Sequence, residues 1–553
     1  MLIEHGADVN VQTQQGRTPL LMAAKRQGNA DLIRLLLAKG ADVHIAGDAS
    51  LLPAAQSGDV EILGLLIERG ADVNAISSRW GETPLHNAAA AGSVPAVRLL
   101  LAKGAKVDAT LRSITAVRGG ATVEAGIGKM TALMWAAPSG SPEMISALLE
   151  AGASVNAQDI RGMSSLMLAV ASETQDLDVV RRLLRAGADV NWQSASGETS
   201  LDWANKFGSR PVISLLQKNG AKEGVRYQPP SPPAGSAAGD TSRAVERSLA
   251  LLERSSAGLF KQSGCTACHH QDATAFAVRA ARSAKLRVDE AAASERLNVM
   301  KSMLGSAQEL AIQGILEGSN IQANHLRGLA AAGFPAGIIT DSAVAGIIPA
   351  QSSDGHWPQS NGFVRSPTSE GAIAWTADAL LALRAYTIPA RRAEFEGRIA
   401  QAAGWLLGTK PRSTEQKASV LLAVSAAGTQ KERVRSIADS LLREQHVDGG
   451  WGGNPNLSSD AHSTGKALYA LREAGRITAG DPSHRRAVQY LLRTQYPDGS
   501  WYVRSRAVGF QPYFQSGFPF EHDQWISAAG TAWAAEAIAR GIEFSMSTSE
   551  AHQ

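Results

Sequence analysis

One short phrase recurs at a nearly constant interval through the first 224 residues, and this self-similarity limits the possible folds more than any other feature. The phrase Gly-Ala-Asp-Val-Asn at 6–10 returns, identically or with small changes, at 40–44, 70–74, 104–108, 152–156 and 187–191, and a partial copy stands at 220–221. Successive glycines of these copies are 34, 30, 34, 48, 35 and 33 residues apart. Such a period predicts a repeat protein in which each unit buries its apolar face only against its neighbours.

Each interval between two copies contains the signals for two short helices. A Thr-Pro step, as at Thr18-Pro19 and Thr83-Pro84, starts the first helix. An apolar run such as 33–37 forms the second helix, and the glycine of the next copy ends it in the left-handed conformation. The pattern strongly resembles the ankyrin repeat, and this resemblance implies an ankyrin-repeat solenoid at residues 1–224 that holds an unidentified protein partner.

Two irregularities interrupt this series. The 48-residue interval contains about fourteen extra residues around 111–128, which form either a binding surface or a tolerated surface loop. In the repeat pattern, Met1 corresponds to the end of a repeat's second helix, and no terminal repeat with a polar outer face stands before it. We therefore expect a truncated N-terminus, so the lack of a secretory signal at 1–5 says little about the compartment.

A change of composition at 225–240 marks the end of the repeats. Residues 229–233 read Pro-Pro-Ser-Pro-Pro and are followed by Gly, Ser and Ala, which favours an extended linker between two domains.

The chain has 54 Lys and Arg against 51 Asp and Glu, so its net charge of +3 predicts no nucleic-acid partner. No apolar stretch is long enough to predict a transmembrane segment.

A second repeated motif follows the linker. Gln-x-x-Asp-Gly-x-Trp occurs three times, at 351–357, 445–451 and 495–501, and each copy lies between an apolar helix and a helix rich in Ala and Leu. Asp-Gly makes the chain reversal, while Gln and Trp tie one helix end to its neighbour. We therefore expect Trp357, Trp451 and Trp501 to be packing anchors rather than ligand contacts.

These turns resemble the Gln-Trp motifs of squalene cyclases and the related turns of protein prenyltransferase β subunits, whose domains are α/α toroids. The resemblance covers residues 241–545. A degenerate copy at 405–410 and two earlier helix pairs, at 241–285 and 289–333, bring the number of predicted pairs to about six, enough to close a ring. The predicted fold class is therefore all-α, an ankyrin-repeat solenoid followed by an α/α toroid.

The resemblance leaves the activity of the toroid open. Squalene–hopene cyclases protonate their substrate with an Asp-x-Asp-Asp motif, and this chain has no two adjacent aspartates. The prenyltransferase β subunits bind zinc, and the resemblance carries their ligands over to Asp460, His462 and His522, with His462 in place of a cysteine. Alternatively, Asp460 caps a helix N-terminus and both histidines lie at solvated loop ends.

The sharpest chemical signal is Cys-x-x-Cys-His at 265–269, which uses both cysteines of the chain. This is the attachment motif of c-type haem, in which Cys265 and Cys268 would bond to the porphyrin and His269 would be the proximal iron ligand. The competing interpretations are a redox-active cysteine pair, half of a zinc site, and two buried structural cysteines. The candidates for the second axial haem ligand are Met300, Met303 and His325.

Two classes of function follow from these signals. The first is a scaffold whose ankyrin repeats hold a partner and whose toroid carries a covalent haem in a redox or sensing role, in the periplasm or secreted. The second is a cyclase-like or prenyltransferase-like enzyme, or a toroid whose cavity takes an apolar small molecule, with or without zinc; without haem, we expect it in the cytoplasm. The colour of the purified protein separates the two classes, because only the first contains haem.

Overall fold

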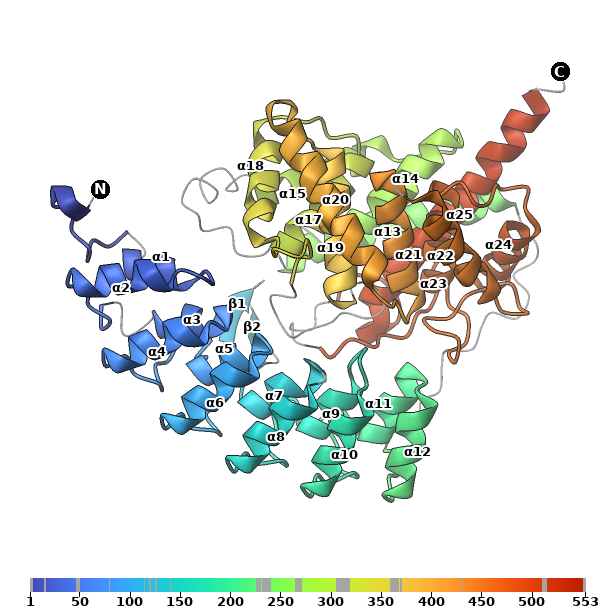
Figure 1. Cartoon of the computed structure of the whole chain (residues 1–553). Helices are drawn as coiled ribbons and strands as arrows, with labels where there is room; N and C mark the ends of the chain where they lie inside the picture. The colour runs from blue at the N-terminus through green and yellow to red at the C-terminus, as the bar shows by residue number, and fades with distance from the viewer. Residues whose placement is uncertain are drawn as a thin grey trace.

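The computed structural model of the protein describes residues 3–550, apart from 14–15, 46–49, 79, 114, 119–120, 125–126, 140, 225–229, 231–239, 264–270, 305–318, 359–367, 369, 429 and 510–514. The fold of this part is helical except for one two-stranded hairpin, which confirms the predicted fold class. Short helix pairs form a stack, and the longer helices that follow form a ring against it (Figure 1). Within the same residues, no helix is long and apolar enough to cross a membrane.

Six helix pairs make the ankyrin stack, as far as the structure describes residues 3–224. The first helices of the pairs are α1 (Pro19–Ala24), α3 (Leu51–Ser57), α5 (Pro84–Ala90), α7 (Ala132–Ala136), α9 (Ser165–Val170) and α11 (Ser200–Phe207). The second helices are α2 (Ala30–Ala38), α4 (Val60–Glu68), α6 (Val94–Ala102), α8 (Pro142–Glu150), α10 (Leu177–Arg185) and α12 (Arg210–Lys218). Each first helix packs on the next first helix, and each second helix on the next second helix, around one continuous apolar core.

The recurring phrase holds neighbouring repeats together. Asn10 accepts a hydrogen bond from the backbone N–H of Asp42 (2.9 Å) and donates one to the carbonyl of Gly40 (2.9 Å). Asn74 and Asn191 make the same pair of bonds to the copy that follows them, at 2.8 to 3.2 Å. The asparagine that ends these copies therefore satisfies two backbone groups of the next repeat, a role that the spacing alone did not reveal.

The extra residues of the 48-residue interval form a β-hairpin. Strand β1 (Thr115–Arg118) pairs antiparallel with β2 (Ala121–Glu124), with Thr115 opposite Glu124. Thr and Val, which favour strands, make up half of these eight positions. The all-α expectation did not include this element, because a four-residue strand leaves too short an alternation to recognise in the sequence.

In the described part of residues 241–550, six further helix pairs form the ring, as expected from the Gln-Trp turns. Its inner helices are α14 (Asp272–Ser283), α17 (Ser319–Ala331), α19 (Gly371–Ala385), α21 (Thr414–Ala427), α23 (Ala461–Glu473) and α25 (Gln524–Glu550). Each packs on the next, and α25 packs on α14, which closes the ring. The outer helices are α13 (Thr241–Ser263), α15 (Glu290–Leu304), α18 (Ile338–Ile347), α20 (Arg392–Gly408), α22 (Lys431–Arg443) and α24 (Pro482–Thr494).

The tryptophans of the three turns are buried anchors, as expected. Trp357, Trp451 and Trp501 are at most 1% exposed. In each case the indole N–H donates to a carbonyl near the end of the preceding outer helix, at 2.7 to 2.8 Å. The backbone N–H of each tryptophan donates to a threonine hydroxyl of the following inner helix, at 2.9 to 3.0 Å. Each tryptophan therefore joins the two helices of its own pair.

The glutamines of the turns join one pair to the next. Gln351 donates to a carbonyl of α20 (3.1 Å) and Gln445 to a carbonyl of α24 (2.8 Å). Gln495 donates to the carbonyl of Ala244 in α13 (2.9 Å), so the last turn is tied to the first helix of the ring. At Gly449, φ is +94° and a Cβ would lie 2.4 Å from a backbone oxygen of α24, so only glycine fits this close approach.

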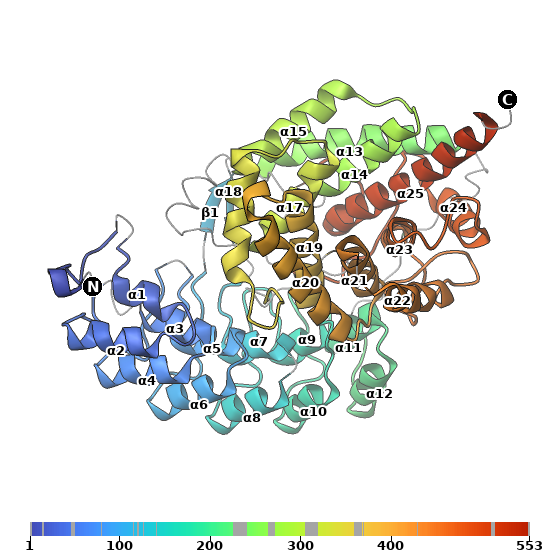
Figure 2. The ribbon, with the colours of Figure 1, turned by 45° about the horizontal axis from the view of Figure 1, so that its top comes forward.

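The ankyrin stack lies against one end of the ring. Its first helices line the side that faces the ring, and its second helices lie on the far side (Figure 2). Asn454, just before α23, donates to the carbonyl of Phe207 in α11 (2.8 Å), and Arg161, before α9, donates to the carbonyl of Gly509 (2.7 Å). The stack thus covers the N-terminal mouth of the ring, which is the end where α19, α21, α23 and α25 begin.

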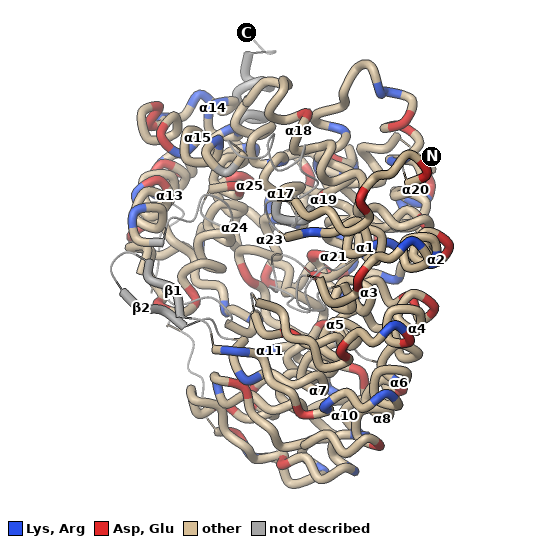
Figure 3. Tube along the Cα trace, turned by 90° about the vertical axis from the view of Figure 1, so that its left-hand side faces the viewer, with Lys and Arg blue, Asp and Glu red and all other residues tan. Residues whose placement is uncertain are grey.

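Charged residues of both signs are interspersed along the stack and the ring (Figure 3). This distribution agrees with the small net charge of the sequence, +3.

Candidate functional site

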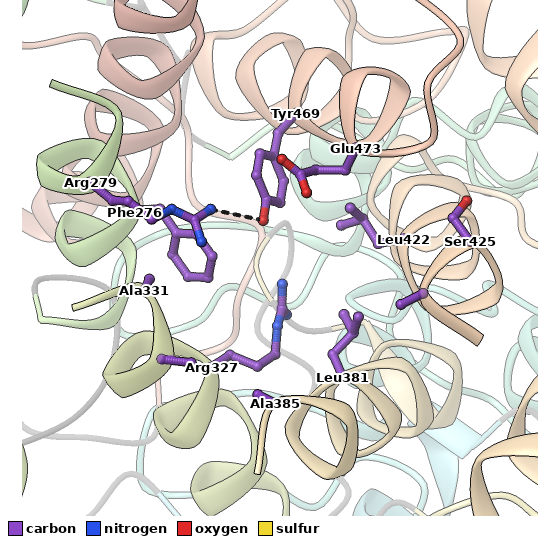
Figure 4. Close-up of a pocket in the computed structure, with 12 residues that line it drawn as sticks. Phe276, Arg279, Arg327, Ala331, Leu381, Ala385, Leu422, Ser425, Tyr469 and Glu473 are labelled. Atoms are coloured by element: carbon purple, nitrogen blue, oxygen red, sulfur yellow. Dashed lines mark hydrogen bonds between the residues drawn. The ribbon is translucent and has the colours of Figure 1, made fainter. Parts of the chain in front are cut away.

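A cavity of about 250 Å³ lies at the opposite end of the ring, the C-terminal mouth, where α14, α17, α19, α21 and α23 end. Its wall combines apolar, aromatic and charged side chains (Figure 4). The lining residues are Phe276, Arg279, Arg327, Ala330, Ala331, Leu381, Ala385, Leu422, Ser425, Ala426, Tyr469 and Glu473. An apolar cavity with a few polar groups directed into it is typical of a small-molecule site.

Two arginines and a tyrosine provide the polar groups of this cavity. Arg279 donates to the hydroxyl of Tyr469 (3.4 Å), while its Nε atom is buried and has no hydrogen-bond partner among the residues described. Arg327 is hydrogen-bonded to Asp378 on the neighbouring inner helix. Burial raises the pKa of Tyr469, and the charge of Glu473 adds to this effect, so the hydroxyl remains protonated and able to donate.

A second group of charges lies beside Glu473, which lines the cavity. Arg540 of α25 contacts Glu536 (3.3 Å) and approaches Glu473 (4.0 Å). Burial raises the pKa of Glu536 to about 7, against the opposing effects of Arg540, Arg472 and Arg279. A carboxyl group with this pKa carries only part of a negative charge at neutral pH. Among the charged residues that line the cavity, two are arginines, Arg279 and Arg327, and one is a carboxylate, Glu473.

Aromatic rings form the floor of the cavity. The ring of Phe276 lies 5.7 Å from that of Tyr469 and 5.1 Å from that of Trp533, measured between centroids. The guanidinium groups of Arg279 and Arg327 lie 5.3 and 5.7 Å from the centroid of Phe276. These cation–π contacts hold both arginines beside the cavity.

Below this floor, charged side chains fill the middle of the ring. Glu415 of α21 accepts from Lys466 (3.2 Å) and contacts His462 (3.3 Å), both on α23. Burial acts to raise the pKa of Glu415, but Lys466 and His462 outweigh it and the net shift is downward. Burial raises the pKa of Asp378, opposed by Arg327 and Lys466. In the described residues, these ion pairs therefore occupy the middle of the ring, where a deep apolar cavity would otherwise lie.

The predicted zinc ligands behave differently from one another. Asp460 caps α23 by accepting hydrogen bonds from the backbone N–H and the hydroxyl of Ser463 (2.7 and 2.9 Å). His462 is 1% exposed and turned toward Glu415, with its Nδ1 atom buried and unpaired among the described residues. His522 is exposed in the short helix η5 (Glu521–Asp523). In the described part of the chain, no three His, Cys, Asp or Glu side chains gather as a metal site, so the geometry lends zinc no support.

The predicted haem ligands Cys265, Cys268 and His269 lie outside the described residues. The flanking helices are described: α13 ends at Ser263 and α14 begins at Asp272, so the motif joins an outer to an inner helix. Among the candidates for the second axial ligand, His325 bonds Asp272 (2.9 Å) and the carbonyl of Met300 (2.7 Å). Both ring nitrogens of His325 are therefore engaged, which does not fit an iron ligand. The side chain of Met300 is fully buried, and that of Met303 is not described.

The cavity residues were not recognised in the sequence, because they belong to no motif. A usable signal is the presence of single charged residues inside inner helices that are otherwise rich in Ala and Leu, such as Asp378 and Lys466. On a helix surrounded by other helices, an isolated charge requires a partner on a neighbouring inner helix. This reasoning would have placed ion pairs inside the ring, but it would not have located the cavity.

The fold and these sites define a two-part protein, an ankyrin stack joined to an α/α toroid. A family model described as ankyrin repeats matches the chain three times, over residues 1–77, 51–159 and 133–226.

Part of the chain is similar to drimenyl diphosphate synthases and to squalene–hopene cyclases. A drimenyl diphosphate synthase of Streptomyces showdoensis is 32% identical over 180 residues, which are 30% of this chain and 32% of the relative. A drimenyl diphosphate synthase of Streptantibioticus cattleyicolor is 41% identical over 88 residues, 16% of this chain and 15% of the relative. The squalene–hopene cyclase of Bradyrhizobium diazoefficiens is 35% identical over 114 residues, 18% and 16% of the two chains. The matches thus span at most about a third of these relatives.

Proposed function

We propose that the protein is an interaction scaffold whose ring binds a small amphipathic anion in the cavity at its C-terminal mouth. The observation that carries this proposal is the pair Arg279 and Arg327, which flank an aromatic and aliphatic cavity beside the hydroxyl of Tyr469. Guanidinium groups bind phosphate and carboxylate oxygens in paired hydrogen bonds. The names of two relatives contain a diphosphate, which is an anion of this kind.

The size of the cavity limits what it can hold. A diphosphate group with a short apolar segment fits its volume of about 250 Å³, and a longer apolar chain would extend out of the mouth of the ring. Since the middle of the ring contains the Glu415 and Asp378 ion pairs and the chain lacks an Asp-x-Asp-Asp motif, we propose binding rather than cyclisation.

The test compares three probes by isothermal titration calorimetry: farnesyl diphosphate, farnesol and inorganic pyrophosphate. We expect farnesyl diphosphate to bind most tightly and farnesol least. Arg279→Gln should weaken binding of the diphosphates by roughly 10- to 100-fold, because a hydrogen bond to a charged group contributes about 1.5 to 3 kcal/mol. The control is Arg282→Gln on the same helix, where the side chain pairs with the exposed Glu290 away from the cavity. Equal binding by both variants would refute the proposal.

A second candidate function is the covalent haem at Cys265, Cys268 and His269. The observation in its favour is that the motif connects α13 to α14, an outer to an inner helix, where later pairs have Gln-Trp turns. A bound haem would supply one-electron redox chemistry. Export to a bacterial periplasm that contains a haem-attachment system should yield haem-linked peroxidase activity on denaturing gels, and Cys268→Ala should abolish it. Colourless protein with two titratable thiols would favour the redox-pair or structural interpretation.

A further inference from the structure

The first helix pair of the ankyrin stack has an apolar side that is exposed in the described part of the chain. Leu32 and Leu35 of α2 are 43% and 46% exposed, and Met22 of α1 is 39% exposed. Leu32 and Leu35 lie on the same side of α2, because residues three apart in a helix are neighbours on its surface. The pair α1 and α2 stands at the end of the stack opposite α12 (Figure 1). Met22, Leu32 and Leu35 therefore form the end face of the stack.

The position of Leu32 is buried in every later repeat. Leu32 is the third residue of α2. The third residues of the other five second helices are at most 1% exposed, and they are Ile62, Ala96, Met144, Val179 and Val212. Val212 is buried although α12 is the last second helix of the stack, so this position packs on the preceding pair.

The position of Met22 gives the same comparison. Met22 is the fourth residue of α1, and the fourth residues of α9 and α11 are Leu168 and Trp203. Leu168 is 2% exposed and Trp203 is 4% exposed. The end face is thus the kind of surface that a neighbouring repeat covers elsewhere in this stack.

The opposite end of the stack is more polar. The eighth residue of α2 is the buried Leu37, whereas the eighth residue of α12 is the exposed Gln217. Ile213 and Leu215 of α12 are half-buried. A polar outer surface is typical of a repeat that ends a stack. The two ends of the stack therefore differ, and the apolar end face has no matching apolar surface at α12.

We propose that the end face is the interface of a homodimer, in which two copies of the chain join their ankyrin stacks end to end about a two-fold axis. A two-fold contact presents the same patch from both copies, so each end face is covered by its own equivalent. The apolar cores of the two stacks then continue into one another, as they do between repeats within one chain. Head-to-tail stacking is disfavoured, because it would place Leu32 and Leu35 against the polar end at Gln217.

The charges of α2 determine how the two copies of this helix are oriented. Asp31 in the first turn is fully exposed, and the exposed Lys39 directly follows the helix. When α2 is antiparallel to its equivalent, Asp31 of each copy lies near Lys39 of the other, and the two helix dipoles oppose each other favourably. A parallel orientation would bring like charges together. Surface ion pairs contribute little affinity, so these charges set the orientation while the apolar side chains provide the stability.

Arg34 does not take part in this arrangement. It bonds Asp31 of its own helix (2.9 Å) and pairs with Glu61 of α4, so it is held on the side of α2 that faces the next repeat.

Sedimentation velocity of the full chain tests the proposal, over about 1 to 100 µM protein. We expect the mass to rise with concentration from that of one chain to that of two. Leu32→Asp should weaken the dimer by at least about 100-fold, because a two-fold interface contains each substitution twice. The matched control is Ile338→Asp in α18 of the ring, where an equally apolar side chain is 65% exposed away from the end face, and it should dimerise as the parent protein does. Circular dichroism checks that both variants keep their helix content.

Charge reversal tests the antiparallel orientation. Asp31→Lys should weaken the dimer by roughly 3- to 10-fold, since two attractive pairs become repulsive, and the further substitution Lys39→Asp should restore most of the loss. A monomeric parent protein at the highest concentration would assign the end face to another protein or to a further repeat and would overturn the proposal. A dimer that Leu32→Asp leaves intact, or growth beyond the dimer as head-to-tail stacking predicts, would overturn it as well. The end face and the cavity lie in different domains, so none of these results depends on the ligand proposed for the ring.

Discussion

Replacement of Trp451 tests whether the Gln-Trp turns hold the ring together. The indole is completely buried, and its N–H donates to the carbonyl of Leu441 at 2.7 Å. Trp451→Ala should destabilise the ring by about 3 to 5 kcal/mol, since a large aromatic side chain is lost from a packed site. Trp451→Phe should cost about 1 to 3 kcal/mol, because it retains much of the ring volume but leaves the Leu441 carbonyl without its donor.

Differential scanning calorimetry measures this effect on the full chain. A loss of 3 to 5 kcal/mol should lower the unfolding temperature of the ring by roughly 6 to 20 °C, while a transition of the ankyrin stack should move much less. The matched control is Trp405→Ala in the same ring. Trp405 is half-buried and stacks on His356 with 4.9 Å between ring centroids, so its loss should cost less. Equal shifts for Trp451→Ala and Trp405→Ala would refute the anchoring role.

Three further predictions concern other parts of the chain. Burial lowers the pKa of His86 to about 4, so the free energy of unfolding of the stack should fall as the pH drops from about 6.5 toward 4. Urea unfolding at several pH values measures this, and the midpoint should depend much less on pH in His86→Gln. Gly465→Ala should destabilise the ring by more than about 1 kcal/mol in thermal melts, because the added Cβ would lie 2.5 Å from the backbone of Trp533. Gly397→Ala is the control and should be neutral or stabilising, because nothing lies within 4 Å of the added Cβ. Limited proteolysis should cut the linker near 229–239; cuts inside either domain instead would contradict the predicted domain boundary.

The repeated elements could be predicted because their causes are local. Thr18 and Thr83 cap the helices that their Thr-Pro steps predict, with their hydroxyls accepting from the first turn. The three Gln-Trp turns place their tryptophans in the core, as the motif indicated. The haem motif and nearly all of the linker lie outside the described residues, so both stay predictions. The hairpin at 115–124 was not anticipated.

The candidate site depended on distant contacts and was therefore beyond sequence reasoning. Asp460 was predicted either as a zinc ligand or as the cap of a helix N-terminus, and in the structure its side chain caps its own helix. The cavity requires Arg279, Arg327 and Tyr469 to meet from three helices that the motifs do not connect.

By itself, the sequence determined the two repeat systems, since each unit satisfies its backbone through neighbours about one period away, as Asn10 does with Asp42. Only the tertiary structure decided that the ring closes through Gln495 and Ala244, that ion pairs fill its centre, and that the stack covers one mouth. The contact between Arg161 and Gly509 spans 348 residues. The repeat pattern of the sequence does not predict such a contact, because the contact depends on how the two folded domains pack together and not on the pattern within either domain.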